Sequence, residues 1–150
     1  MGRRPGTASG ASDDRVAVVI VDHGSRREAS NAMLASVVDA FRRRSEDSPA
    51  GRRFVAVEAA HMEIAEPSIA TAVGRCVAEG ATRVVVTPFF LAPGRHIQED
   101  IPALVAEAAR NYPGVALTVA QPLGTHPLAL DILEARVDES LVADVAGVQS

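Results

Sequence analysis

The sequence predicts an α/β domain built on a four-stranded parallel sheet with helices on both faces. The chain has 150 residues, which is the usual length of one domain. Apolar residues make up 47% of the chain and charged residues 23%, as expected of a globular protein with one packed core. Apolar β-branched runs alternate four times with segments of helical periodicity. This strict alternation is typical of a parallel sheet with crossover helices.

The composition divides the chain into three segments. Residues 1–14 consist mainly of Gly, Ser, Arg and Asp, and we expect a disordered leader there. The regular alternation occupies residues 15–141, which we predict to be a single domain. Residues 142–150 lack a strong pattern, and we expect this tail to fray.

The first half of the domain reads as two strand–helix units. Residues 16–21 are a continuous run of Val, Ala and Ile, which is typical of a strand that is buried on both faces. Apolar residues then recur at helical spacing over 27–44. A second strand is predicted over 54–60, followed by a helix over 67–80 with Pro67 in its first turn.

The second half repeats this arrangement. The remaining elements are strands over 83–87 and 115–120 and helices over 101–111 and 128–141. Asp100 is the expected N-cap of the third helix, and Pro102 is expected in its first turn, where a missing N–H group is tolerated.

Composition excludes several classes of chemistry. All 15 basic residues are arginines, so Schiff-base catalysis and a Walker-type phosphate lysine are excluded. The net charge of −4 and the low aromatic content of 3% argue against nucleic-acid binding. Cys76 is the single cysteine, which excludes an internal disulfide and favours a cytoplasmic setting. No apolar run approaches the roughly 20 residues that cross a bilayer, so we expect no membrane partner.

The four histidines stand in the four segments that follow the predicted strands: His23, His61, His96 and His126. Ligands of parallel sheets bind at the carboxyl ends of the strands, and imidazole is a common ligand of divalent transition metals. We therefore expect a metal site assembled across loops. Glycine beside His23 and His96 favours these two as ligands, whereas a surface or capping role is the simpler interpretation of His61 and His126.

Three charged residues in the same loops have two interpretations each. Glu63 stands between a strand and a helix, where a carboxylate either favours the helix N-terminus or serves as a metal ligand or proton acceptor. Arg26 and Arg95 each lie within three residues of a histidine. They are either solvated charges or binders of an acidic ligand. Cys76 falls on an apolar helical stripe and is expected to be buried and inert.

These loops carry a resemblance to a known family. The sequence His23-Gly-Ser-Arg26 after the first strand, Glu63-Ile-Ala-Glu-Pro-Ser68 after the second, and the long segment 88–102 after the third resemble the short, CbiX-type sirohydrochlorin chelatases. Segment 122–127 is similar to the fourth-strand loop of that family. The similarity covers residues 15–137 with matching order and spacing.

The resemblance implies a flavodoxin-like fold of the class II chelatases and a homodimeric enzyme. Such an enzyme is a lyase that inserts Co²⁺ or Fe²⁺, and in some relatives Ni²⁺, into the tetrapyrrole sirohydrochlorin, in cobalamin or siroheme biosynthesis. The divalent metal is a substrate, and no organic cofactor is implied.

The resemblance also assigns roles to residues of this sequence. His23 and His96 match the two metal-ligating histidines, and Glu63 matches a position linked to the active site, so these three are the expected catalytic residues. From the same loops we expect substrate contacts from Ser25, Arg26, Phe90, Leu91 and Arg95. The sequence departs from the family pattern at His61, where an aromatic or apolar residue is expected, and at Asp22, where a small residue is usual.

Three other functions remain open at this point. A non-catalytic metal carrier would use the same histidines without acting on a tetrapyrrole. A flavodoxin-like FMN binder would need a Ser/Thr-rich phosphate loop and flanking aromatic residues, and the first loop offers one serine. A histidine phosphatase would need arginine before His23, where this chain has Asp22.

Overall fold

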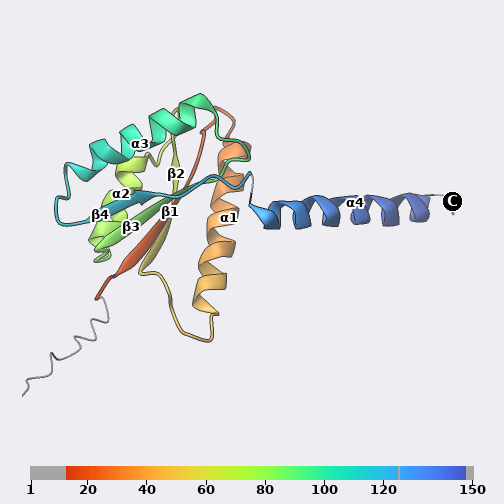
Figure 1. The fold of residues 1–150 in the computed structure, drawn as a ribbon, viewed down its shortest axis with the longest axis horizontal. Coiled ribbons are helices and arrows are strands. Elements are labelled where there is room, and N and C mark those ends of the chain that lie inside the picture. Colours follow the sequence, from red (N-terminus) through yellow and green to blue (C-terminus); the bar gives the residue numbers. More distant parts are fainter. Residues whose placement is uncertain (1–12, 125, 148–150) are drawn as a thin grey trace, which may run out of the picture.

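The computed structural model describes residues 13–147 apart from residue 125, together with their side chains except those of His96 and residues 144–146. Strands and helices alternate along this part of the chain (Figure 1). The elements are β1 (Val16–Asp22), α1 (Glu28–Glu46), β2 (Ala56–His61), α2 (Ile69–Ala78), β3 (Arg83–Pro88), α3 (Arg95–Ala109), β4 (Ala116–Val119) and α4 (Pro127–Gly147).

The strands form one parallel sheet in the order β2-β1-β3-β4, which confirms the predicted fold class. The chain moves from β1 to one neighbour, β2, and then crosses back to the other, β3. The direction of winding therefore reverses at β1, where ligands of such sheets bind outside the carboxyl ends of the strands. The segments that follow β2, β1 and β3 meet at this edge.

Each face of the sheet has its own apolar core. Helices α2 and α3 cover one face, with fully buried Val19, Val84 and Cys76 between them and the sheet. Helix α1 covers the other face over β1 and β2, where it buries Leu34 and Val38. These two layers and the sheet between them form the body of the domain in Figure 1.

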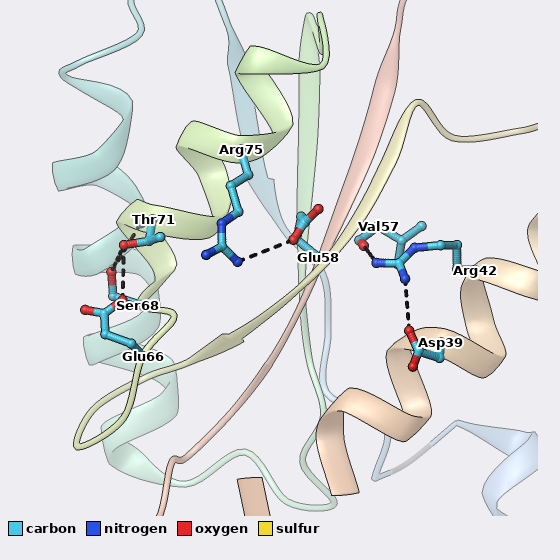
Figure 2. Close-up of polar contacts among 8 residues, drawn as sticks. All are labelled: Asp39, Arg42, Val57, Glu58, Glu66, Ser68, Thr71 and Arg75. Carbon is cyan, nitrogen blue, oxygen red and sulfur yellow. Dashed lines mark hydrogen bonds and ion pairs between the residues drawn. The ribbon is translucent and has the colours of Figure 1, made fainter. Parts of the chain in front are cut away.

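Polar side chains attach the helices to the strands at the margins of these cores (Figure 2). From α1, Arg42 donates a hydrogen bond of 2.6 Å to the carbonyl oxygen of Val57 on β2. From α2, Arg75 lies 3.8 Å from the carboxylate of Glu58 on the same strand. Strand β2 is therefore connected to a helix on each face of the sheet.

Two predicted helix starts are wrong. Helix α2 begins after Ser68, whose hydroxyl accepts a hydrogen bond from the backbone N–H of Thr71, so Pro67 precedes the N-cap and does not stand in the first turn. Helix α3 begins at Arg95 after Gly94, which places Asp100 and Pro102 inside the helix. The pattern misled the prediction because Asp100 and Pro102 together imitate a cap and a first turn.

Helix α4 was predicted, but it is longer than predicted. It continues six residues beyond Leu141 into the segment that was expected to fray, and residues 148–150 lie outside the described part of the chain. Of the predicted leader, the structure describes only residues 13 and 14, which have no regular structure. Helix α4 leaves the body of the domain as a single projecting rod (Figure 1). Within the described residues, no helix combines the length and apolar character that crossing a membrane requires.

Candidate functional site at the carboxyl end of the sheet

The segments that follow β1 and β2 are joined through their backbones. The backbone N–H of Met62 donates to the carbonyl oxygen of Asp22 at 2.9 Å, and the N–H of Glu63 donates to that of His23 at 3.2 Å. These bonds continue the β1–β2 ladder beyond the last strand residues. They fix His23 and Glu63 side by side, although the two residues are 40 positions apart in the sequence.

The side chains of His23 and Glu63 face one another at this edge. Nε2 of His23 lies 3.7 Å from Oε1 of Glu63, and each side chain is 56% exposed. Two ligands that bind one transition-metal ion at about 2.1 Å each are separated by about 3.5 Å when the geometry is tetrahedral. The observed spacing is close to this value, so one solvent-accessible ion fits between the two side chains.

Gly24 makes this arrangement possible. It has a φ of +89°, and a Cβ atom added to it would lie 1.9 Å from the carbonyl oxygen of Glu63. The sequence suggested that glycine beside His23 lets a ligand approach closely. The structure shows that the close neighbour is the backbone of Glu63, which can pack here only because residue 24 has no side chain.

The loop after β3 contacts the same site. The ring of Phe90 meets that of His23 edge-on, with centroids 6.1 Å apart and an interplanar angle of 89°. Leu91, also expected to contact substrate, is 76% exposed. A Cβ on Gly124 would lie 1.4 Å from the carbonyl oxygen of Leu91, so the loops after β3 and β4 are packed backbone to backbone.

His96 is the second residue of α3, which follows the loop after β3. The sequence had suggested that His96 lies in the loop itself. Its side chain lies outside the described part of the structure. Among the described side chains, no group of three or more His, Cys, Asp or Glu residues could hold a metal ion. His23 and Glu63 are thus the described pair at this edge, and the role of His96 stays a prediction.

His61 differs from its simplest interpretation as a surface or capping residue. It is the last residue of β2 and is 4% exposed, and its Nδ1 lies 2.5 Å from Oδ1 of Asp22, its register partner at the end of β1. The same Oδ1 atom accepts a hydrogen bond of 3.1 Å from the backbone N–H of Gly24. The two departures from the family pattern are therefore one buried pair beneath the turn that carries His23.

The remaining predicted residues either form local hydrogen bonds or are exposed to solvent. His126 caps α4, because its Nδ1 accepts a hydrogen bond of 3.2 Å from the backbone N–H of Leu128, as the capping interpretation expected. The hydroxyl of Ser25 accepts a hydrogen bond of 3.0 Å from the N–H of Arg27, which stabilises the turn before α1. Arg26 and Arg95 are both exposed to solvent on this side of the fold, from the loop after β1 and the start of α3.

Comparisons with known proteins show the family of the chain. The profile of the CbiX family matches residues 17–140. The chain belongs to the CbiX family. It is 44% identical over 140 residues to the sirohydrochlorin ferrochelatase, chloroplastic, of Arabidopsis thaliana.

Two solved structures are similar in fold to this CbiX-family chain. One is a putative cobalamin biosynthesis CbiX protein from Marinobacter aquaeolei VT8, with a TM-score of 0.70 and 27% identity, covering 85% of this chain and 98% of that one. The other is the sirohydrochlorin chelatase SirB from Bacillus subtilis subspecies spizizenii in complex with cobalt, with a TM-score of 0.68 and 27% identity, covering 83% of this chain and 50% of that one.

The relatives differ in length from this chain. The match to the Arabidopsis protein covers 93% of this chain and 59% of that protein. The chain therefore corresponds to roughly one half of some relatives and to the whole of others, such as the Marinobacter protein.

Proposed function

We propose that this chain inserts a divalent metal ion, Co²⁺ or Fe²⁺, into sirohydrochlorin. The observation that carries the proposal is the pairing of His23 with Glu63 at the solvent-exposed edge where β1 and β2 end. Membership of the CbiX family, together with relatives named as sirohydrochlorin chelatases, supplies the substrate class.

Metal insertion requires that the ion lose water, that the ring bend, and that two pyrrole N–H protons leave. In this proposal His23 and Glu63 hold the ion through one imidazole nitrogen and one carboxylate oxygen, and His96 provides a further imidazole from the start of α3. A site with few protein ligands leaves coordination positions open, so ring nitrogens can replace the remaining water molecules and then the protein ligands. As the ion is transferred stepwise to the ring nitrogens, whichever of His23 and Glu63 has released it would accept a pyrrole proton, so that both protons leave before insertion is complete.

Substrate binding falls to the residues around this pair. Sirohydrochlorin carries several carboxylate groups, and Arg26 and Arg95 are exposed residues from the loop after β1 and from the start of α3. Arginine binds carboxylates through two parallel hydrogen bonds, which positions a planar substrate as well as attracting it. Leu91 offers an exposed apolar surface in the loop after β3, and the ring of Phe90 contacts that of His23.

The identity of the metal ion, the cellular setting and the oligomeric state are finer parts of the proposal, and they rest on the sequence. Both Co²⁺ and Fe²⁺ accept imidazole and carboxylate ligands, so the chemistry of His23 and Glu63 does not choose between them, and Ni²⁺ is a third possible substrate. The cytoplasmic setting stays a prediction, and the Arabidopsis relative is chloroplastic. We also propose that the protein acts as a homodimer.

Absorbance spectra of sirohydrochlorin test the proposal directly. The pigment is mixed with Co²⁺, or with Fe²⁺ under anaerobic conditions, in the presence of catalytic amounts of protein. We expect the spectral change of metal insertion to proceed through many turnovers per protein chain. A change limited to one equivalent, or no acceleration, would support the metal-carrier function and overturn the enzymatic one.

Variants locate the activity. His23→Ala and Glu63→Gln are each expected to lower the rate by at least about tenfold at saturating metal, because each removes one ligand or proton acceptor. Glu58→Gln is the matched control. It neutralises a carboxylate on β2, the strand that precedes Glu63, but Glu58 faces Arg75 of α2 and not the site (Figure 2). Normal turnover in His23→Ala would show that the metal does not bind here.

A further inference from the structure

Asp22 and His61 form a buried polar contact that the proposed chemistry does not use. Nδ1 of His61 lies 2.5 Å from Oδ1 of Asp22, and the two side chains are 5% and 22% exposed. Among the residues that the structure describes, His61 is the only polar or charged residue that is buried. Taking an imidazole and a carboxylate out of water costs free energy, and apolar side chains of similar size would fill the space at least as well. The pair therefore calls for a role beyond packing.

The Asp22 carboxylate also holds the turn that contains His23. A carboxylate oxygen accepts hydrogen bonds, so Oδ1 of Asp22 accepts one from Nδ1 of His61 and one of 3.1 Å from the backbone N–H of Gly24. The bond to Gly24 spans His23, the residue between the two, and so restricts its backbone. Gly24 also lies against His61, since a Cβ atom added to Gly24 would be 3.2 Å from Cβ of His61. The turn therefore rests on the pair through a hydrogen bond and a close contact.

His61 stands at the base of the loop that carries Glu63. Its backbone N–H donates to the carbonyl oxygen of Pro67 at 2.8 Å, which closes the segment 62–67 into a loop. Glu63 is the second residue of this segment. His61 thus connects the base of the loop to the turn that Asp22 holds.

The side chains of His23 and Glu63 need such support because both are open to solvent. Nε2 of His23 and Oε1 of Glu63 lie 3.7 Å apart, and each side chain is 56% exposed. The ligands of one transition-metal ion must keep their bond lengths within about 0.2 Å, so a small shift of either backbone removes one ligand from reach. Most of this accuracy has to come from the backbone beneath the two side chains.

We propose that Asp22 and His61 are positioning residues for metal binding, and this inference rests on the proposed function. Their buried contact holds the turn of His23 at the distance from Glu63 that one divalent ion requires. Metal ligands are commonly oriented by groups that do not touch the metal, and loss of such a group lowers metal affinity by about 10- to 100-fold. Here the support acts on the backbone of the ligand and not on its ring.

Co²⁺ binding in the absence of the tetrapyrrole tests this inference. The full chain is titrated with the metal alone, and the visible absorption of Co²⁺ reports both its affinity and the geometry of its ligands. His61→Phe keeps a ring in the buried position and removes the hydrogen-bond donor, whereas Asp22→Ala removes the acceptor. In both variants we expect Co²⁺ to bind at least about tenfold more weakly, and its absorption at saturation to differ from that of the wild type.

Conservative variants separate the hydrogen bonds from the volume of the side chains. Asp22→Asn keeps a carbonyl oxygen that accepts from Gly24, and His61→Asn keeps an N–H donor close to the position of Nδ1. Each is expected to bind Co²⁺ more tightly than the corresponding Ala or Phe variant. If Asp22→Ala does not fold, the comparison of His61→Phe with His61→Asn makes the same test.

Two control variants account for charge and for stability. Glu58→Gln removes a carboxylate of β2 that faces Arg75 and not the site (Figure 2). Val38→Ala leaves a cavity in the apolar core between α1 and the sheet, and it lowers the thermal stability through that cavity. Both are expected to bind Co²⁺ as the wild type does, measured at a temperature at which every variant is folded.

The outcomes separate this inference from the proposed function. Co²⁺ affinity and absorption that are unchanged in His61→Phe and Asp22→Ala would overturn the positioning role, even if both variants had a lower Tm. An equal loss of affinity in Val38→Ala, or no recovery in the Asn variants, would also overturn it. A wild type that binds no Co²⁺ would overturn the proposed function together with this inference. A wild type that binds Co²⁺ but does not insert it would overturn the enzymatic function alone.

Discussion

Substitution of Gly24 by alanine tests the close packing on which the candidate site depends. Gly24 and Gly51 have nearly the same positive φ, +89° and +83°, but different surroundings. A Cβ on Gly24 would lie 1.9 Å from the carbonyl oxygen of Glu63, whereas a Cβ on Gly51 would have no neighbour within 4 Å. Gly51→Ala therefore measures the cost of the backbone conformation, and Gly24→Ala measures that cost together with the clash.

The expected magnitudes follow from these contacts. A non-glycine residue in the left-handed region costs about 1–2 kcal/mol, partly offset by the lower entropy of the unfolded alanine chain, so we expect about 1 kcal/mol for Gly51→Ala. In Gly24→Ala the Glu63 carbonyl must also move away. This displacement breaks the two backbone hydrogen bonds between the β1 and β2 loops, at about 1 kcal/mol each, for a total of about 3 kcal/mol.

Thermal unfolding and metal insertion are the two assays. At about 4 °C per kcal/mol, the expected fall in Tm is about 4 °C for Gly51→Ala and about 12 °C for Gly24→Ala. Because the displaced loop carries Glu63 away from His23, we also expect Gly24→Ala to lose roughly 100-fold in insertion rate at temperatures where it remains folded. Equal losses of Tm in the two variants, or normal insertion by Gly24→Ala, would refute the reasoning.

Four further predictions concern three residues near the site or in the core. Ile64, at φ 73° and 61% exposed, holds a conformation that branched residues rarely adopt, so Ile64→Asn should raise the free energy of unfolding by about 1 kcal/mol in urea titrations; a loss would contradict this. Ser68→Ala removes the N-cap of α2 and should cost about 1 kcal/mol, read from the same titrations, whereas no change would mean that the cap is dispensable. Burial, and secondarily the charge of Glu58, raises the pKa of Cys76 from 9.0 to about 12, so its reaction with a disulfide reagent at pH 8 should be roughly 1,000-fold slower in the folded than in the unfolded chain. The unfolded thiol ionises first, so the stability of the wild type relative to Cys76→Ala should be constant below pH 9 and fall as the pH rises towards 12; a rise would show that the folded thiol ionises first.

The sheet was predictable because its signal is local. The β-branched run beginning at Val16 and the run beginning at Arg83 need both faces covered, and that requirement is visible in the composition alone. Helix starts were less predictable. The sequence around Asp100 and Pro102 satisfies the local rules for a helix N-terminus, yet α3 begins five residues before Asp100. A proline at the eighth position of a helix looks the same in the sequence as one in a first turn.

The pairings within the site depend on register, which the sequence does not display. That His23 and Glu63 belong to one edge followed from the expected parallel sheet, but their contact depends on β1 and β2 being neighbours that end at the same level. The pairing of Asp22 with His61 has the same origin. In the sequence, Asp22 and His61 each depart from the family pattern, but nothing there connects the two residues. Only the register of the parallel strands β1 and β2 places them opposite one another. A rule that pairs polar residues at the ends of consecutive strands would have found this contact.

The fold also shows why the exposed pair of proposed ligands, His23 and Glu63, can be rigid. Both side chains at the site are more than half exposed, and exposed side chains usually have freedom to move. Here the backbone beneath them is held by two interstrand hydrogen bonds, by the absence of a side chain at Gly24, and by the buried Asp22–His61 pair. In the proposed function, exposure at the edge would give access to a large planar substrate, while order in the backbone below would preserve the spacing of the two ligands. The proposed site would therefore hold a metal ion loosely enough to pass it on and still present it at a defined point.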